Sequence, residues 1–238
     1  MNHTSVISNL AAHIQRAKNL AYLGYPYTLG ETNSIAGQGR NGETNVFGDA
    51  LWLVDFSLWA AEHNIRRLHF HQGTDYRYGS WQPISHKGLP VATRPPYYGQ
   101  VMVAKALDRS EQMRIKNLAL EGDTEAAYAL FDGERLAKVV VLNMQTFNSS
   151  TAGERPSKNY RFRVPSATAA AGSRVKVERL MAAGSDAEDG TTFGGVSYDY
   201  NLQQGKPVVV DDKKEAVDVE DGVVAVDVPD SSAALLSF

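Results

Sequence analysis

The spacing of hydrophobic and polar positions divides the chain into two parts that meet near residue 107. In the first part, apolar residues recur at helical spacing after Thr4 or Ser5, either of which can cap a helix that Gly24 ends. The elements predicted after it are a strand at 26–31, a helix at 46–63, a strand at 66–72 and a helix at 96–107. Strands that alternate with helices predict a parallel sheet. A long polar loop follows each strand at its carboxyl end, where active sites form in folds of this type.

The second part carries many short strand patterns and no helical one. Turn signals at Asp132-Gly133, Asp189-Gly190 and Asp221-Gly222 punctuate these patterns. The strands are predicted at 114–121, 126–131, 136–144, 160–164, 174–181, 196–200, 207–210, 216–219, 223–228 and 233–238. We therefore expect an antiparallel β-sandwich over residues 108–238.

The first part is too small for a complete (β/α)8 barrel, because such a barrel needs eight strands and usually about 250 residues. Residues 1–107 are therefore either a βα unit that covers the sandwich or a piece of a longer chain.

Composition narrows the range of partners. The 238 residues are 43% hydrophobic and 21% charged, which is typical of a globular protein. The formal charge of -3 and the lack of a basic cluster argue against binding to nucleic acid or to a membrane surface. The absence of cysteine excludes disulfides and thiolate metal sites. No apolar run is long enough to span a membrane, and the first residues form no signal-peptide pattern. Asn2 and Asn148 begin N-x-S/T triplets that could accept glycans.

Glu31 stands at the end of a predicted strand, directly before a glycine-rich loop. A carboxylate in that place can attack an anomeric carbon or serve as a general acid or base. The alternative is a glutamate that only orders the loop.

His69 and His71 share one face of the next predicted strand, and Gln72 lies on the other. The pair could bind a metal, but zinc needs at least one more protein ligand and no HExxH motif is present. We therefore expect no metal, and prefer a polar site wall or a buried histidine. Aromatic and cationic residues follow the strand, namely Tyr76, Arg77, Tyr78, Trp81, Arg94, Tyr97 and Tyr98. Rings suit the C–H faces of sugars, and arginine with tyrosine can bind a carboxylate, although an ordinary loop with packed aromatics is the alternative.

Several of these segments occur together, in the same order, in one family. Residues 1–107 resemble the end of the catalytic barrel of glycoside hydrolase family 79, which contains fungal and bacterial β-glucuronidases and is related to heparanase. The resemblance is carried by residues 1–4 (MNHT), 29–34 (LGETNS), 45–52 (NVFGDALW), 69–73 (HFHQG), 76–78 (YRY) and 93–99 (TRPPYYG). From residue 108 onward it rests on position and strand pattern, since these enzymes end in a β-sandwich packed on the barrel.

The resemblance implies an α/β plus all-β architecture. Residues 1–107 would be the last two strands and helices of a (β/α)8 barrel, and residues 108–238 a C-terminal β-sandwich domain. Glu31 matches the nucleophile of a retaining β-glucuronidase. The residues expected to bind substrate are Gly37, Gln38, Gly39 and Tyr78, which match the region that receives the sugar carboxylate, and Asn33, His69, Gln72 and Tyr76, which would line the site. The expected partner is a carbohydrate, namely a β-glucuronide or a proteoglycan-type glycan, and no cofactor is expected.

Retaining hydrolysis also needs a second carboxyl group, about 5 to 5.5 Å from the first. In the family this acid/base residue lies at the end of the fourth strand, in a segment that this sequence does not contain. Glu43 and Glu62 are no substitutes, since one lies in the loop and the other on a helix. We therefore expect a fragment, inactive alone, of a longer and secreted enzyme.

The alternative function is a non-catalytic carbohydrate-binding or scaffold protein, for which Trp81, Tyr97 and Tyr98 would supply exposed rings. In either case, the open edges of the strands at 26–31 and 66–72 predict poor solubility or dimerisation through those edges.

Overall fold

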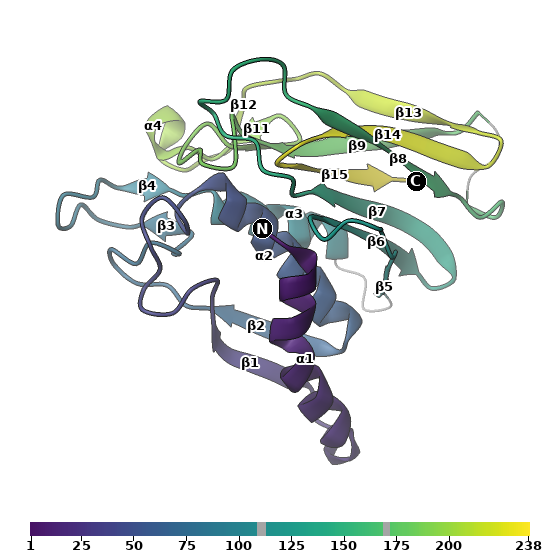
Figure 1. Ribbon diagram of the computed structural model, residues 1–238, viewed down its shortest axis with the longest axis horizontal. Coiled ribbons are helices and arrows are strands. Elements are labelled where there is room, and N and C mark those ends of the chain that lie inside the picture. The colour runs from purple at the N-terminus through teal and green to yellow at the C-terminus, as the bar shows by residue number, and fades with distance from the viewer. Residues whose placement is uncertain (109–112, 169–171) are drawn as a thin grey trace.

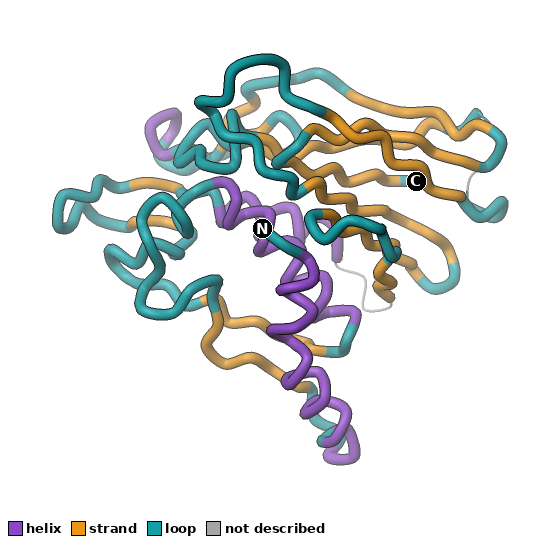
Figure 2. The backbone as a smooth tube through the Cα atoms, in the orientation of Figure 1, coloured by secondary structure: helices purple, strands orange, loops and turns teal. Residues whose placement is uncertain are grey.

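The computed structural model describes residues 1–108, 113–168 and 172–238. Three long helices and a pair of parallel strands form one side of the molecule, and a large antiparallel sheet forms the other (Figures 1 and 2). The described part of the chain is thus mostly β structure with few helices. None of its helices is both long enough and apolar enough to cross a membrane.

Helix α1 (His3–Asn19) begins two or three residues earlier than a cap at Thr4 or Ser5 predicts. Its N-cap is Asn2, whose side-chain oxygen accepts a hydrogen bond from the backbone N–H of Ser5 at 2.9 Å. The predicted cap, Thr4 or Ser5, is therefore wrong. Thr4 lies in the first turn instead and donates its hydroxyl to the Asp123 carboxylate at 2.7 Å.

The apolar face of α1 follows the predicted pattern, but the helix ends at Asn19, before the glycine that was predicted to end it. Val6, Leu10 and Ile14 are buried along one face of the helix. A single 3-10 turn, η1 (Ala21–Leu23), follows, and Gly24 ends it in the left-handed conformation with φ of 72°.

Strands β1 (Tyr27–Thr32) and β2 (Ile65–Phe70) lie side by side, and helix α2 (Phe47–Glu62) connects them. Leu29 pairs with Leu68 in a parallel register, which confirms the predicted parallel sheet. Both strands therefore end at the same edge, where the polar loops begin.

Helix α3 (Pro96–Leu107) has the predicted bounds and packs on α2. The two helices approach closely at Gly99, where an added Cβ would come within 2.6 Å of the Ala50 carbonyl oxygen. Before α3, the second polar loop contains a small hairpin that the sequence did not predict, formed by β3 (Trp81–Gln82) and β4 (Ala92–Thr93).

All strand pairs in the second part are antiparallel, as predicted. The strands are β5 (Met113–Asn117), β6 (Glu125–Asp132), β7 (Arg135–Asn143), β8 (Ser157–Arg163), β9 (Arg174–Met181), β10 (Thr192–Phe193), β11 (Val196–Ser197), β12 (Val208–Val209), β13 (Glu215–Glu220), β14 (Val223–Pro229) and β15 (Ser232–Ser237). They form one continuous sheet, because β13 pairs with β9 as well as with β14, and β14 pairs with β8. The sheet curls so that β8, β13 and β14 lie over β7 and β15 (Figure 1).

The region after β9 departs most from the sequence-based expectation. The stretch between the strands predicted at 174–181 and 196–200 contains β10, which the sequence did not predict, and the strand predicted at 196–200 is shortened to β11. A short helix, α4 (Tyr200–Gln203), follows in a part for which no helix was predicted. Asp199 caps this helix by accepting a hydrogen bond from Asn201 N, and this local bond favours a turn over a strand.

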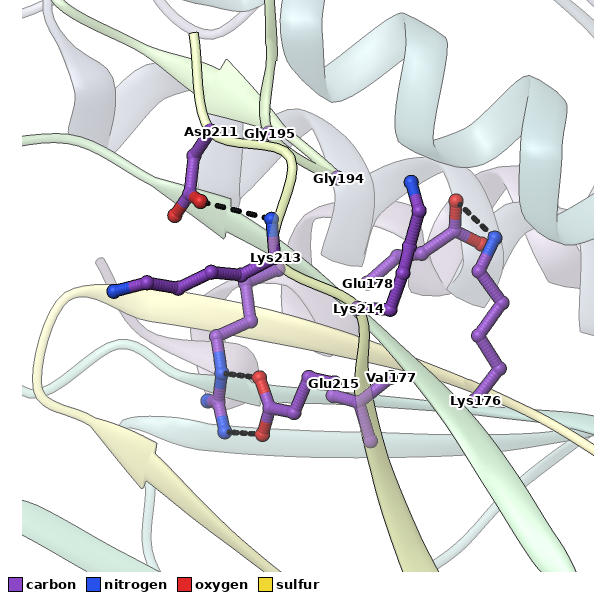
Figure 3. A pocket seen from close by; sticks show the side chains of 10 residues that line it. Lys176, Val177, Glu178, Gly194, Gly195, Asp211, Lys213, Lys214 and Glu215 are labelled. Carbon is purple, nitrogen blue, oxygen red and sulfur yellow. Dashed lines mark hydrogen bonds and ion pairs between the residues drawn. The ribbon is translucent and has the colours of Figure 1, made fainter. Parts of the chain in front are cut away.

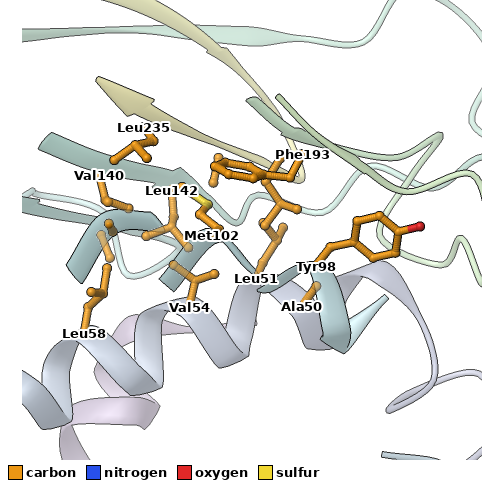
Figure 4. Packing of buried hydrophobic residues seen from close by; sticks show 14 of the residues in the cluster. Ala50, Leu51, Val54, Leu58, Tyr98, Met102, Val140, Leu142, Phe193 and Leu235 are labelled. Atoms are coloured by element: carbon orange, nitrogen blue, oxygen red, sulfur yellow. The ribbon is translucent and has the colours of Figure 1, made fainter. Parts of the chain in front are cut away.

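The described residues form three hydrophobic cores. One lies inside the curl of the sheet, between residues such as Val141 and Val226. A second lies between the sheet and helices α2 and α3, where Leu51 and Met102 meet Leu142 (Figure 4). The third joins α1, α2, β1 and β2. Helix α2 contributes to two of these cores, which explains why its sequence is apolar nearly all round.

Candidate active site

Glu31 lies near the carboxyl end of β1, where the chain leaves the parallel sheet for its glycine-rich loop. Its side chain is 73% exposed, and Oε2 is 3.7 Å from Nδ1 of His71. His71 directly follows the last residue of β2. The carboxylate and the imidazole therefore extend from the ends of two neighbouring strands.

Backbone and amide hydrogen bonds hold these two strand ends together. The backbone N–H of His71 donates to the Thr32 carbonyl at 3.1 Å. The Asn33 side-chain amide donates to the His71 carbonyl, also at 3.1 Å. Asn33 therefore orders the pair Glu31–His71 through the main chain.

Two tyrosines of the following loop pack around His71. The imidazole stacks on Tyr76, with ring centroids 5.2 Å apart, and meets Tyr78 edge to face at 6.3 Å. Tyr78 is only 5% exposed. Its burial raises the pKa of the phenol, and the negative charge of Glu31 raises it further, so Tyr78 stays protonated at neutral pH. A neutral phenol next to a carboxylate is a hydrogen-bond donor for that carboxylate or for its ligand.

The loop after β1 is shaped by three successive residues with left-handed backbones: Gly37, Gln38 and Gly39, with φ of 74°, 72° and 81°. The Gln38 carbonyl accepts a hydrogen bond from Arg77 N at 2.7 Å. A Cβ on Gly39 would come within 2.8 Å of Tyr78 N. Only glycine therefore allows this loop to approach the loop after β2 that carries Tyr76 and Tyr78, called the tyrosine loop below. No such contact surrounds Gly37.

The remaining predicted site residues, Gln72 and His69, are placed differently. Gln72 uses its side-chain oxygen to accept a bond from Ser80 N at 2.7 Å and thereby folds the tyrosine loop. His69 is exposed on β2, and no hydrogen bond or ring contact joins it to Glu31 or the tyrosines within the described residues. Within the same residues, no three His, Cys, Asp or Glu side chains gather as metal ligands would.

Arg94 is one of the arginines that could have bound a substrate carboxylate, but its guanidinium makes other contacts. The side chain is buried and donates to the carbonyls of Tyr76 and Gly79 and, at 3.0 Å, to Gln82 Oε1. Burial lowers its pKa, with the charge of Arg77 lowering it further. Arg94 therefore fixes the tyrosine loop from behind. Arg77, whose Nη1 donates to the Asp75 carbonyl at 2.6 Å, is the more accessible cation.

His71 is the residue that sequence reasoning left out of its list of substrate contacts. The His-Phe-His motif pointed to both histidines, and strand alternation put them on one face. The two histidines differ in their place relative to β2, which ends at Phe70. His69 lies within the strand, whereas His71 follows it and reaches the end of the sheet where Glu31 lies.

A separate cavity of about 490 Å³ lies on the β sheet and has a different character (Figure 3). Its charges are largely paired with one another. Arg179 is held by both oxygens of Glu215, and Lys176 lies 2.9 Å from Glu178. These paired charges stabilise the strand surface.

Comparison with known proteins identifies the chain. The sequence model described as the glycosyl hydrolase family 79 C-terminal beta domain matches residues 127–235. A β-glucuronidase of Aspergillus niger is 46% identical over 252 aligned positions, which cover 100% of this chain and 47% of that protein. The chain corresponds to the C-terminal portion of glycoside hydrolase family 79.

Further relatives agree with the family 79 assignment. A β-glucuronidase of Neurospora crassa is 36% identical over an alignment that covers 87% of this chain and 43% of that protein. The chain thus spans about half the length of the curated family 79 relatives that it matches.

Solved structures support the fold. A 4-O-α-L-rhamnosyl-β-D-glucuronidase from Fusarium oxysporum, solved with Rha-GlcA, superposes with a TM-score of 0.83 at 24% identity, covering 100% of this chain and 49% of that one. A family 51 arabinofuranosidase from Xanthomonas axonopodis pv. citri reaches a TM-score of 0.53 at 13% identity, covering 99% and 48%.

Proposed function

We propose that this chain is the C-terminal part of a retaining β-glucuronidase and that Glu31 is its nucleophile. The position of Glu31 is the observation that carries the proposal. Its carboxylate extends from the carboxyl end of a parallel strand, is open to solvent, and lies beside His71 and a protonated Tyr78. A carboxylate so placed can attack an anomeric carbon, while the phenol donates to a substrate oxygen or to the carboxylate itself.

The same proposal covers the domains. Residues 1–107 are the last two strands and helices of a (β/α)8 barrel, and residues 108–238 are a C-terminal β-sandwich domain. The parallel pair β1–β2 with its α2 crossover supports the first assignment, and the family match over residues 127–235 supports the second.

The second carboxyl group comes, in this proposal, from the half of the enzyme that the relatives have and this chain does not span. The two acidic residues considered within the chain are engaged elsewhere. Glu43 lies 3.7 Å from Arg40 in the loop, and Glu62 lies 3.7 Å from Lys116 at the last residue of α2. The chain alone is therefore inactive, and the longer parent is a secreted glycoprotein that removes terminal β-glucuronosyl units from glycans.

A chimera tests the chemistry. The N-terminal half of the Aspergillus niger relative, joined to this chain, should hydrolyse an aryl β-glucuronide, and Glu31→Gln should lower kcat on the order of 10⁴-fold. A 2-fluoro-glucuronosyl fluoride should label Glu31, located by peptide mass. A chimera that keeps its activity after Glu31→Gln would exclude Glu31 as the nucleophile.

The size of the natural protein tests the fragment. An antibody against the β sheet should detect, in culture fluid, a band well above the 26.0 kDa of this chain. A band at 26.0 kDa inside the cells would contradict both the longer parent and its secretion.

A non-catalytic carbohydrate-binding or scaffold role is the second candidate, and Trp81, 45% exposed, favours it. The other two rings offered for it differ: Tyr97 is half-buried and Tyr98 is buried. Saturable glucuronide binding that Glu31→Gln leaves unchanged would support this role over the nucleophile. Self-association through the edges of β1 and β2 is a further proposal, which a monodisperse monomer in sedimentation would contradict.

A further inference from the structure

A small cavity lies beside the hairpin β3–β4, where it meets helix α4 of the β sheet region. Its volume is about 260 Å³. The aromatic residues that line it are Trp81 from β3, Tyr97 from the first turn of α3 and Tyr200 from α4. The cavity therefore joins segments from both parts of the chain. Figure 1 shows the hairpin β3–β4 and helix α4 side by side.

Two of the three rings of this cavity, Trp81 and Tyr97, are held in place by ring contacts. Trp81 meets Tyr97 edge to face with centroids 6.0 Å apart, and Tyr97 packs in the same way on Tyr198 at 5.3 Å. Trp81 nevertheless remains 45% exposed and Tyr200 36% exposed. A rigid ring that stays accessible offers contact area at a low cost in conformational entropy.

The hairpin beneath the rings is fixed by Gln82, which is 1% exposed. Its side-chain oxygen accepts from Asp75 N at 2.9 Å and from Arg94 at 3.0 Å, and its amide donates to the Ile84 carbonyl at 2.8 Å. The side-chain amide of Gln82 therefore forms its hydrogen bonds within the protein. By contrast, the side chains of Thr93 and Gln204 line the cavity without a hydrogen bond inside the described residues. The Thr93 hydroxyl and the Gln204 amide can therefore form hydrogen bonds with the hydroxyl groups of a ligand.

The charge of the cavity decides which ligand it fits. Among the described residues that line it there is no Asp, Glu, Lys or Arg, unlike at the Glu31 site. An anion or a cation would lose its hydration there without gaining a partner. A neutral pyranose fits better, since its C–H face stacks on an indole and its hydroxyls reach an amide and a hydroxyl.

We propose that Trp81, Tyr97 and Tyr200 form a second carbohydrate-binding site, separate from Glu31, that takes a neutral pyranose unit of a glycan. The site adds a contact to the rest of a polymeric substrate, and its existence does not depend on the chemistry of Glu31.

Intrinsic fluorescence of the 238-residue chain tests this site. The chain has three tryptophans, and the other two, Trp52 and Trp59, lie half-buried on α2, so a ligand at the cavity changes mainly the emission of Trp81. Glucose, cellobiose and glucuronic acid are the probes. We expect a saturable change with the two neutral sugars, and a response to glucuronic acid at least tenfold weaker.

Variants then locate the binding. Trp81→Ala and Tyr200→Ala should weaken binding of cellobiose at least tenfold, the first followed by calorimetry because its reporter is gone. Tyr22→Ala is the matched control, because Tyr22 is 81% exposed in the turn η1, beyond the C-terminal end of α1, and it should change binding less than twofold. Glu31→Gln should also change it less than twofold.

Three outcomes would overturn the proposal. The first is the absence of saturable binding of a neutral sugar by a folded chain. The second is binding that survives Trp81→Ala but is lost in Glu31→Gln, which would move the sugar to the Glu31 site and leave the proposed nucleophile standing. The third is sedimentation in which the chain is a dimer that Trp81→Ala converts to a monomer, because Trp81 would then be an interface residue.

Discussion

A fully buried carboxylate joins the two parts of the molecule, and its removal should be costly. Asp55 lies on α2 with no exposed surface. Its Oδ1 is 2.9 Å from Nδ1 of His3 on α1, and it accepts the hydroxyl of Tyr128 on β6 at 2.5 Å. Burial, and then the charge of Asp55, keep the pKa of Tyr128 well above its ordinary value, so the phenol remains a donor.

The variant Asp55→Asn keeps the shape of the side chain and removes its charge. A hydrogen bond to a charged group contributes about 1.5 to 3 kcal/mol and a neutral one about 0.5 to 1.5 kcal/mol, so the loss over two bonds is roughly 2 to 3 kcal/mol. In a protein of this size each kcal/mol corresponds to about 2 to 4 °C in Tm. We therefore expect Tm to fall by about 4 to 12 °C.

Urea unfolding followed by circular dichroism measures this loss, with Asp218→Asn as the control. Asp218 also faces an arginine, Arg174, but both are exposed, so the control should stay within about 0.5 kcal/mol of the parent chain. A double-mutant cycle with Tyr128→Phe should give a coupling of about 0.5 to 3 kcal/mol. A loss below about 1 kcal/mol for Asp55→Asn, or additive single effects, would refute the reasoning.

Other predictions concern single positions. Burial raises the pKa of Asp49 to about 8, an effect that the nearby Ser34 hydroxyl reduces. The folded chain then retains a proton that the unfolded chain releases near 3.8, so stability should fall as pH rises from there to about 8. Asp49→Asn should therefore stabilise more at pH 8 than at pH 5, by up to about 4 kcal/mol, and an equal effect at both pH values in urea unfolding would contradict this. Asn2→Ala should cost about 1 kcal/mol in thermal unfolding, and Asn2→Asp should restore most of it if the cap is the cause. Gly39→Ala should destabilise clearly more than Gly37→Ala, since both have left-handed backbones but only the Cβ at 39 meets Tyr78; equal losses would mean that backbone strain alone decides.

The elements that the sequence predicted well depend on local signals. Pro96 fixes the start of α3 because proline suits the first helical turn, and the bounds of that helix are as expected. The turn at Asp221-Gly222 joins β13 to β14 as predicted, and both of its residues have positive φ.

The features that were missed depend on distant partners. Tyr98 was expected to be exposed, but its hydroxyl lies 3.1 Å from Ser197 Oγ and accepts from Tyr198 N at 2.7 Å. These partners are about a hundred residues away in the sequence, and no local pattern announces them. In the same way, strand alternation placed His71 on a face but could not show that Glu31 and two tyrosines would meet it there.

In the proposed β-glucuronidase, the exposure of Glu31 sets the limit of what this chain alone contributes. Retaining hydrolysis proceeds in a site that excludes bulk water and presents a second carboxyl group. Here one side of Glu31 is built in detail, with His71 held by Asn33 and Tyr78 held by the approach of Gly39. The other side is open, with 73% of the Glu31 side chain in contact with solvent. Part of an active site would have this arrangement, with ordered residues on one side and solvent on the other. In the proposed enzyme, the remaining site residues therefore come from the N-terminal portion that the relatives have and this chain does not span.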